Sequence, residues 1–334
     1  MISDGLFDLQ VNGYAGVDFN DPALTPALLD HALEAMLASG VTQCLPTLIT
    51  AHPDELAERF TAIDRAVSAS RLGPAMVPGY HLEGPFLREI EGYSGCHPQD
   101  AMRDPEIALI ERLEQRLERP ILLITLAPER NGAIEFIVEM TRRGKVAAMG
   151  HSAAGFAAVR TAADAGLTLS THLGNGLPQQ LPKLENTLLA QLSEPRLAAC
   201  LIADGHHMSP EALAALIRLK GAGNCILVTD AVLGAAAAPG LYSFANMAVE
   251  RTMGGAMVQP GRTNLAGSAL CLDKAVRNTV AWTGLPSEAA IAMASDAPRR
   301  AMARSFKHYG IDLPRGRVRW SSDLSPTLET TVGL

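Results

Sequence analysis

The chain has 334 residues, 48% of them hydrophobic and 19% charged, which is an ordinary composition for a globular protein with a sizeable core. Its formal net charge of −7 argues against nucleic acid as a partner. The start "MISDGLFDLQ" does not resemble a signal peptide, no run of 18 apolar residues occurs, and the five cysteines are scattered, so we expect a cytoplasmic protein with no membrane span and free thiols.

Short apolar runs alternate along the chain with longer amphipathic stretches. Eight runs have the length and composition of buried strands, at 6–13, 42–47, 75–84, 121–128, 146–152, 167–174, 198–205 and 225–231. Helical periodicity is clearest between them at 26–38, 53–68, 105–117, 133–143 and 210–219, and proline begins several of these stretches, as is common at the first helical position.

This alternation indicates βαβ units and a parallel sheet, and eight units predict a (β/α)₈ barrel of the TIM type. A doubly wound sheet is the main alternative. It would normally carry a G-x-G-x-x-G loop after its first strand, and "QVNGYAGVDFND" does not match that pattern. The stretch "GAAAAPG" at 234–240 is expected to be a flexible loop after the eighth strand.

Polar side chains gather where the predicted strands end, which is where a barrel collects its catalytic groups. In chain order they are Asp8, Gln10, Asn12, His81, Glu83, His151, His172, Asp204, His206, His207 and Asp230. For any single histidine in this group, a structural role with its ring hydrogen-bonded is the simpler explanation. A structural role explains poorly why all these polar residues converge on one rim, because so many polar groups in one place are expected to share a bound partner.

Glu83, His151 and His172 form a donor set that suits Zn²⁺ with one position open for water. A metal ion held there would lower the pKa of a water molecule towards ~7. Asp230, on the opposite side of the rim, could accept a proton and pass it to a leaving group. The strand ends therefore predict a hydrolytic metal site.

Eight stretches, in order over about residues 7–305, carry a family signature: "DLQVNGYAGVDFND", "HLEGPFL", "TLAPE", "GHSAAG", "THLGNG", "IADGHHMSPEAL", "LVTDAV" and "LAGSALCLDKAVRN". The chain resembles the N-acetylglucosamine-6-phosphate deacetylases of the amidohydrolase superfamily. The resemblance implies a metal-dependent barrel, amide hydrolysis in amino sugar metabolism, and a homodimer.

The resemblance also implies roles for individual residues. It makes Glu83, His151 and His172 the metal ligands. Asp230 would be the general base and acid, and His97 the residue that polarises the substrate carbonyl. The substrate contacts that it implies are Asn175, Gly176, His207, Leu265, Ala266 and Gly267. It gives no role to His206, for which a solvated position is expected.

Four features depart from the family. Gln10 and Asn12 replace the H-x-H pattern that supports a second metal in many superfamily members, so one divalent ion is expected: zinc first, with Fe²⁺, Mn²⁺ or Co²⁺ as alternatives. Lys183 stands where the family places an arginine that reaches the substrate phosphate across a dimer interface, and a lysine lacks the bidentate fork. The stretch from Glu83 to His97 is longer by about two residues.

The fourth departure concerns the ends of the chain. Family members begin with strands of a small β-sandwich, whereas this sequence starts almost at the first barrel strand. We therefore expect a barrel over 1–308 and a tail over 309–334 that resembles the sandwich's returning strands. The sandwich would be absent or reduced to a C-terminal remnant, with the tail paired to another part of the chain.

These features predict deacetylation of N-acetylglucosamine-6-phosphate to glucosamine-6-phosphate and acetate. Lys183 and the longer loop keep open an amidohydrolase that acts on a different N-acyl or cyclic amide substrate, and leave the need for a 6-phosphate undecided. A catalytically silent sugar-phosphate binding protein is an alternative of another class. The presence of Asp230 beside a ligand set argues against it, because binding alone needs no general base.

Overall fold

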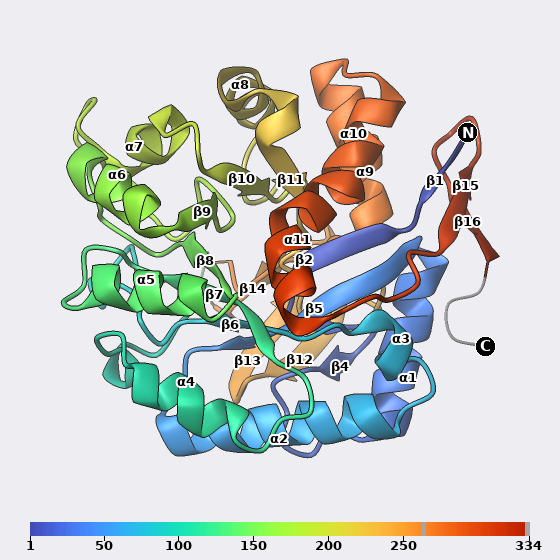
Figure 1. Cartoon of the computed structure of the whole chain (residues 1–334). Helices are drawn as coiled ribbons and strands as arrows, with labels where there is room; N and C mark the ends of the chain where they lie inside the picture. Colours follow the sequence, from blue (N-terminus) through green and yellow to red (C-terminus); the bar gives the residue numbers. More distant parts are fainter. Residues whose placement is uncertain (262–264, 331–334) are drawn as a thin grey trace.

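The computed structural model describes residues 1–261 and 265–330. Eight parallel strands form one nearly closed barrel with helices around it (Figure 1). In chain order they are β2 (Leu6–Val11), β5 (Val41–Ile49), β6 (Tyr80–Glu83), β7 (Ile121–Leu126), β8 (Val146–Met149), β9 (Leu167–Ser170), β10 (Ala198–Leu201) and β11 (Cys225–Leu227). All eight predicted strands and the predicted barrel are confirmed.

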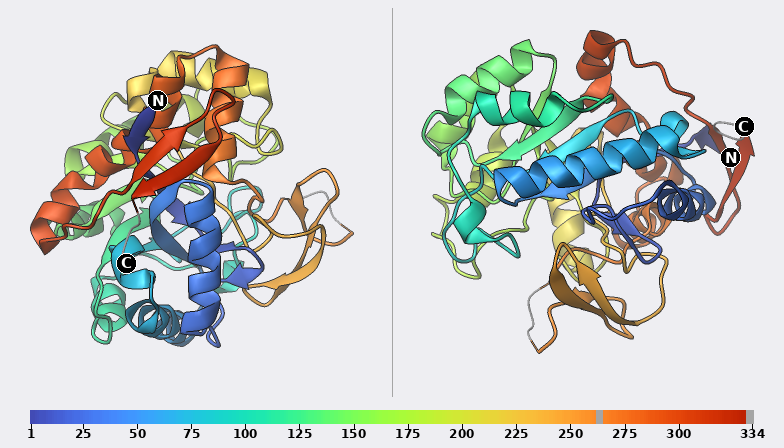
Figure 2. Two further views of the ribbon diagram at one scale, coloured as in Figure 1. Left: turned by 90° about the vertical axis from the view of Figure 1, so that its right-hand side faces the viewer. Right: turned by 90° about the horizontal axis from the view of Figure 1, so that it is seen from below.

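Helices follow most strands and cover the outside of the barrel (Figures 1 and 2). They are α1 (Pro26–Ala38), α2 (Pro53–Ala69), α3 (Gly73–Met76), α4 (Ile107–Glu114), α5 (Ala133–Arg142), α6 (Phe156–Ala165), α7 (Thr187–Ser193), α8 (Pro210–Lys220), α9 (Leu272–Thr283), α10 (Ser287–Ala294) and α11 (Asp296–Tyr309). The side chains of Thr25 and Ser209 cap α1 and α8, each directly before a proline, which explains why these helices begin where they do.

The barrel closes through a short segment beyond β11. Ala231 bridges Val11 on one side and Ser268 on the other, both in parallel orientation. The backbone N–H of Asp230 donates to the Gln10 carbonyl at 2.9 Å, and the N–H of Ser268 donates to the Asp230 carbonyl at 2.9 Å. The segment that carries Asp230 is therefore also the seam of the barrel.

An antiparallel sheet follows the seam and projects beside the barrel (Figure 2). It consists of β12 (Gly240–Phe244), β13 (Met247–Arg251) and β14 (Met257–Val258). Phe244, Val249 and Met257 pack with Ile49 and Val232 of the barrel in a small core of their own. The sequence predicted a loop at 234–240 and no strands after it, because these strands are short, mostly exposed or half-buried, and give no continuous apolar run.

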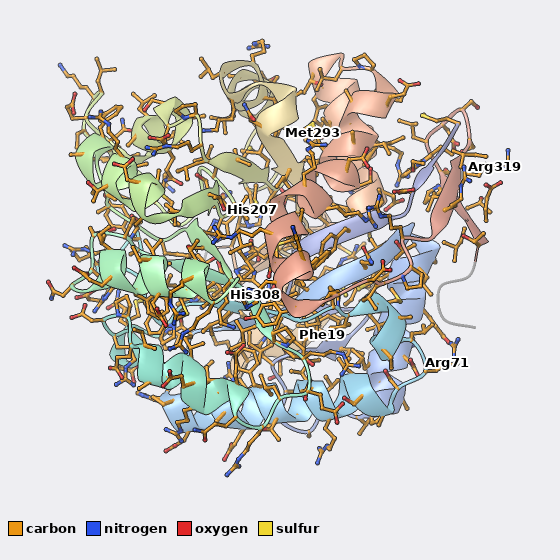
Figure 3. All side chains as sticks on the ribbon, in the orientation of Figure 1. Phe19, Arg71, His207, Met293, His308 and Arg319 are labelled. Atoms are coloured by element: carbon orange, nitrogen blue, oxygen red, sulfur yellow. The ribbon has the colours of Figure 1, made fainter. Side chains whose placement is uncertain are left out.

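The tail pairs with the beginning of the chain. β15 (Arg317–Trp320) lies between β1 (Ile2–Asp4) and β16 (Pro326–Thr330) in an antiparallel sheet. Val318 and Trp320 join the main core, whereas Arg319 lies at the edge of the molecule, paired with Glu329 (Figure 3). The predicted pairing of the tail thus has a partner, β1. That this sheet is a remnant of a sandwich stays a prediction.

Several predicted strands extend two to four residues beyond the observed ones, and two predicted elements differ more in extent. The third predicted helix is shorter, and the third predicted strand begins only at Tyr80, because Pro74 starts the helical turn α3 ahead of it. A two-stranded hairpin of β3 (Gly13–Tyr14) and β4 (Val17–Asp18) follows β2. Within residues 1–261 and 265–330, no helix combines the length and apolarity needed to cross a bilayer.

Candidate active site

A cavity of about 1490 Å³ opens at the carboxyl end of the barrel strands. Most of the residues implicated by the sequence line it: Glu83, His97, His151, His172, Asn175, Gly176, His207, Asp230, Leu265 and Gly267. Ala266 is buried next to this wall, and Lys183 lies exposed outside the cavity of its own chain. These residues thus line one common cavity.

Glu83 is the centre of a cluster of imidazoles. Its Oε1 lies 2.9 Å from Nε2 of His172 and 3.6 Å from Nε2 of His151, and its Oε2 lies 4.0 Å from Nε2 of His97. The potential ligand atoms of Glu83, His97 and His151 all lie within 4.8 Å of one another. A carboxylate with imidazole nitrogens is a donor set that zinc and related divalent ions prefer, so the cluster is a candidate metal site.

The second ring nitrogen of each imidazole tests this assignment. Nδ1 of His151 lies 2.7 Å from the Tyr93 carbonyl and must donate to it, which leaves Nε2 free to bind a metal. Nδ1 of His97 lies 2.8 Å from the Thr50 hydroxyl. Nδ1 of His172 is buried and has no hydrogen-bond partner among the described residues. His151 therefore has the second contact typical of a metal ligand, and the cluster fits a bound cation.

The pKa shifts within the cluster indicate which groups carry a proton before a metal binds. Burial lowers the pKa of His97 to about 3, so its ring is neutral at ordinary pH. Burial alone would raise the pKa of Glu83, but hydrogen bonds from His151 and His172 hold it well below its usual range. Burial would lower the pKa of His172, but its hydrogen bond to Glu83 and the charge of that carboxylate raise it. Metal binding at Glu83 and His172 would therefore displace a proton, because imidazole binds a metal in its neutral form.

Asp230 faces the cluster from the barrel seam. Burial raises the pKa of its carboxyl to about 6, and the charge of Glu83 adds to this shift. Gln10 Nε2 donates to both carboxylates, at 3.1 Å to Glu83 Oε1 and 3.1 Å to Asp230 Oδ1. Asn12 Nδ2 donates to Asp230 Oδ1 at 2.9 Å. Gln10 and Asn12 thus orient Asp230, a role that the sequence analysis did not foresee.

Three residues of the site have an unusual backbone. His151, His172 and Asp230 have φ values of 51°, 28° and 49°, a region that residues other than glycine rarely adopt. Each such conformation costs roughly 1–3 kcal/mol and persists only where surrounding contacts enforce it. The turn after each strand thus directs the side chain into the cavity instead of continuing the strand.

Other polar residues at the rim have different roles. His81 hydrogen-bonds to Thr47 and Thr125 inside the barrel, at 3.3 and 2.8 Å, and is a structural histidine. His207 lines the cavity near the centre of the molecule (Figure 3), with Nδ1 2.7 Å from Asp204 Oδ2. His206 is exposed, as expected, although it too lies at the cavity wall.

The His151 ring leaves no space for a side chain at Gly176. A Cβ added there would lie 2.6 Å from Nδ1 of His151, and φ at this position is +61°. Gly176→Ala should therefore displace the ring, and we expect metal affinity to fall about 10- to 100-fold, as when a supporting contact of a ligand is lost. Isothermal titration of the metal-depleted protein with Zn²⁺ measures this.

Gly174→Ala is the matched control, because it lies in the same loop with φ +94° but its Cβ would meet only Met208 and Leu216, at ordinary distances of 3.7 and 3.9 Å. Both variants carry the backbone cost of alanine at positive φ, about 1–2 kcal/mol of folding stability. Equal metal affinities in the two variants would show that Gly176 does not support His151.

The cavity wall contains no lysine or arginine within residues 1–261 and 265–330. Its ionisable residues in these ranges are Glu83, Glu91, Cys96, His97, His151, His172, His206, His207 and Asp230. This part of the wall therefore offers a phosphorylated ligand histidines but no permanent positive charge.

Comparisons with known proteins agree with the site. No family model matches the chain. It is 34% identical to N-acetylgalactosamine-6-phosphate deacetylase of Escherichia coli O157:H7, over 90% of this chain and 78% of the relative. It is 31% identical to human N-acetylglucosamine-6-phosphate deacetylase, over 97% of this chain and 78% of that one.

Among solved structures, a mutant of N-acetyl-D-glucosamine-6-phosphate deacetylase from Mycobacterium smegmatis, in complex with N-acetyl-D-glucosamine-6-phosphate, superposes with a TM-score of 0.87. It is 27% identical, and the match covers 99% of this chain and 86% of that one. Sequence identity, fold and site lead to one conclusion. The chain belongs to the N-acetylglucosamine-6-phosphate deacetylase family.

Proposed function

We propose that this protein hydrolyses the acetamide of an N-acetylated amino sugar 6-phosphate, releasing acetate and the free amino sugar. The observation that carries the proposal is Asp230, a buried carboxyl group with a pKa raised to about 6 that faces the Glu83 cluster in the cavity. A group with such a pKa can accept a proton and return it near neutral pH. The names of the relatives support this substrate class.

Glu83, His151 and His172 would hold one divalent ion, most simply zinc. When bound, such an ion supplies Lewis acidity, which activates water and polarises a carbonyl. Asp230 accepts the proton of the attacking water and delivers it to the amine nitrogen as the C–N bond breaks. His97 donates a hydrogen bond from Nε2 to the acetyl oxygen, with Thr50 donating to its Nδ1.

The remaining residues in this proposal hold the sugar. Asn175 and Gly176 contact it through their backbone, and His207 contacts the sugar or its phosphate. Leu265, Ala266 and Gly267 lie against the acetyl group. A homodimer and a cytoplasmic location stay predictions from the sequence.

The test is acetate release from a panel of substrates, together with metal content. The panel contains N-acetylglucosamine and N-acetylgalactosamine, each with and without a 6-phosphate, because relatives are named for both sugars. We expect turnover of at least one phosphorylated sugar and about one divalent ion per chain. Bound metal without acetate release from any member would favour a different amide substrate, and binding of a sugar phosphate without hydrolysis would favour the silent binding protein.

Lys183 of a second copy of the chain is proposed to supply a permanent positive charge for the phosphate. It is exposed, and the described part of the cavity wall contains no lysine or arginine. Lys183→Ala should raise KM for the phosphorylated sugar about ten-fold or more, because a charge-assisted bond in a closed site contributes ~1.5–3 kcal/mol. KM for the unphosphorylated sugar should hardly change.

Lys183→Arg is the matched control, and it should be tolerated because it restores a bidentate fork. Steady-state kinetics of both variants on both sugars gives a two-by-two comparison. Equal effects of the alanine change on both sugars would remove Lys183 from the phosphate site. A parent enzyme indifferent to the phosphate would favour the different N-acyl substrate instead.

A further inference from the structure

Asp8 lies on β2 inside the barrel, two residues before Gln10, and the proposed chemistry gives it no part. Its side chain is completely buried, and it does not line the cavity. Burial raises the pKa of its carboxyl to about 7. Burying a carboxyl group costs free energy unless hydrogen bonds offset the loss of hydration. The hydrogen-bond partners of Asp8 therefore indicate which part of the structure it stabilises.

All the partners of Asp8 lie in the two segments that contact Asp230. Oδ1 accepts from the backbone N–H of Gln10 at 3.3 Å and of Thr229 at 3.2 Å. Oδ2 lies 2.5 Å from the Thr229 hydroxyl. Gln10 in turn contacts Asp230 with both its side chain and its backbone carbonyl, and Thr229 directly precedes Asp230.

Asp230 needs such a restraint. Its φ of 49° is unfavourable. Among the described residues, β11 pairs along its length with β10 alone, and the bridge between Ala231 and Val11 joins this edge of the barrel to β2. On the far side of the seam, the Ser268 hydroxyl donates to the Thr229 carbonyl at 2.5 Å. Thr229 is thus held from both sides, and Asp8 provides the contact from β2.

We propose that Asp8 is a positioning residue that ties Thr229 to β2 and so fixes the carboxylate of Asp230 opposite Glu83. Its kinetic consequence rests on the proposed function, in which Asp230 moves the proton. Its structural consequence, the location of residues 229–231, does not depend on any substrate.

Two variants of Asp8 separate positioning from charge. Asp8→Leu fills similar space but leaves two N–H groups without their acceptor and leaves the Thr229 hydroxyl only the Gln10 carbonyl to donate to. Asp8→Asn keeps an amide oxygen for the N–H groups, and its amide can donate to the Thr229 hydroxyl, which then donates to the Gln10 carbonyl at 3.2 Å. Cys44→Ala is the control for a change inside the barrel, since Cys44 is fully buried and lies opposite Asp8 in the β2–β5 ladder.

We expect Asp8→Leu to lower kcat about 10²-fold, the loss typical of a catalytic group displaced by about 1 Å, with KM and metal content unchanged. Asp8→Asn should restore kcat to within about ten-fold of the parent. Cys44→Ala should lower the melting temperature but leave kcat within about three-fold of the parent, since it removes packing and no polar contact of the seam. A crystal structure of Asp8→Leu should show residues 229–231 shifted away from β2.

Several results would overturn the proposal. One is a kcat for Asp8→Leu as high as that of Cys44→Ala. Another is a loss of kcat in Asp8→Asn equal to that in Asp8→Leu, which would show that the charge of Asp8 matters and its hydrogen bonds do not. If Asp8→Leu does not fold, Thr229→Val decides together with Asp8→Asn, because the Thr229 hydroxyl bonds to Asp8 and also accepts from the Ala231 N–H at 3.1 Å. Lower kcat at normal KM in Thr229→Val with near-normal kcat in Asp8→Asn supports the clamp, and unchanged kcat in Thr229→Val rejects it. Lack of activity in the parent would refute the proposed function, whereas an unshifted 229–231 segment would refute the clamp alone.

Discussion

The Asp230→Asn variant is expected to fold and bind metal like the parent and to lose about 10²- to 10⁴-fold in kcat. The change is nearly isosteric, and the new amide oxygen can still accept from Gln10 and Asn12, which contact Oδ1 in the parent. What disappears is a group that can take up a proton, and a general base contributes about this much to turnover. The measurement is kcat for acetate release, with metal content and thermal unfolding recorded on the same samples.

Asp18→Asn is the matched control for this experiment. Asp18 is another largely buried carboxyl group whose pKa burial raises to about 6, and it accepts backbone hydrogen bonds from Asn20 and Ala245 outside the cavity wall. This control variant should keep its kcat even if it loses some stability. An Asp230→Asn enzyme with more than about a tenth of the parent kcat would show that another group carries the proton.

The second large effect distinguishes two possible ligand sets. Family resemblance implies Glu83, His151 and His172, whereas Glu83, His97 and His151 form a compact group whose possible ligand atoms all lie within 4.8 Å of one another. We expect His172→Asn to lose the metal, because Nε2 of His172 is the imidazole nitrogen nearest Glu83, at 2.9 Å. His97→Asn should keep the metal and lower kcat about 10²-fold, the loss seen when one donor to a developing oxyanion is removed.

Elemental analysis of each variant after dialysis against a weak chelator gives the answer without any activity assay. Each variant serves as the control for the other, since both rings are buried and belong to one cluster. Loss of metal from His97→Asn with retention in His172→Asn would assign the compact group as the ligand set. His97 would then bind the ion, and the carbonyl would need another donor.

Much of the barrel could be predicted because its signals are local. Most strands are short runs rich in apolar residues, such as 121–126 or 225–227, and the proline-started helices α1 and α2 lie within a residue of their predicted ends. The pairing of β1 with β15 could not be predicted in this way. Its partners, such as Ile2 and Arg319, lie at opposite ends of the chain and belong to strands too short to give a pattern.

The same division applies to the site. Glu83, His151, His172 and Asp230 were found because each follows a strand, and parallel strands bring their ends together. The supports of these residues are largely backbone atoms or shapes, such as the Tyr93 carbonyl that holds His151 and the space above Gly176. Such features depend on the relative position of loops that are distant in sequence, and no residue type marks them.

The sheet formed by β12, β13 and β14 lines a part of the cavity that lies apart from the proposed catalytic groups. Phe244, Thr252, Ala256 and Val258 of this region line one wall, whereas the proposed proton carrier and metal ligands follow barrel strands. The sheet has its own small core and contacts the barrel at few points, among them Ile49 and Val232. It can therefore vary as a module: exchanging 240–258 between relatives would reshape what the cavity accepts while leaving the bond-breaking groups in place, so substrate range and reaction can evolve separately in this fold.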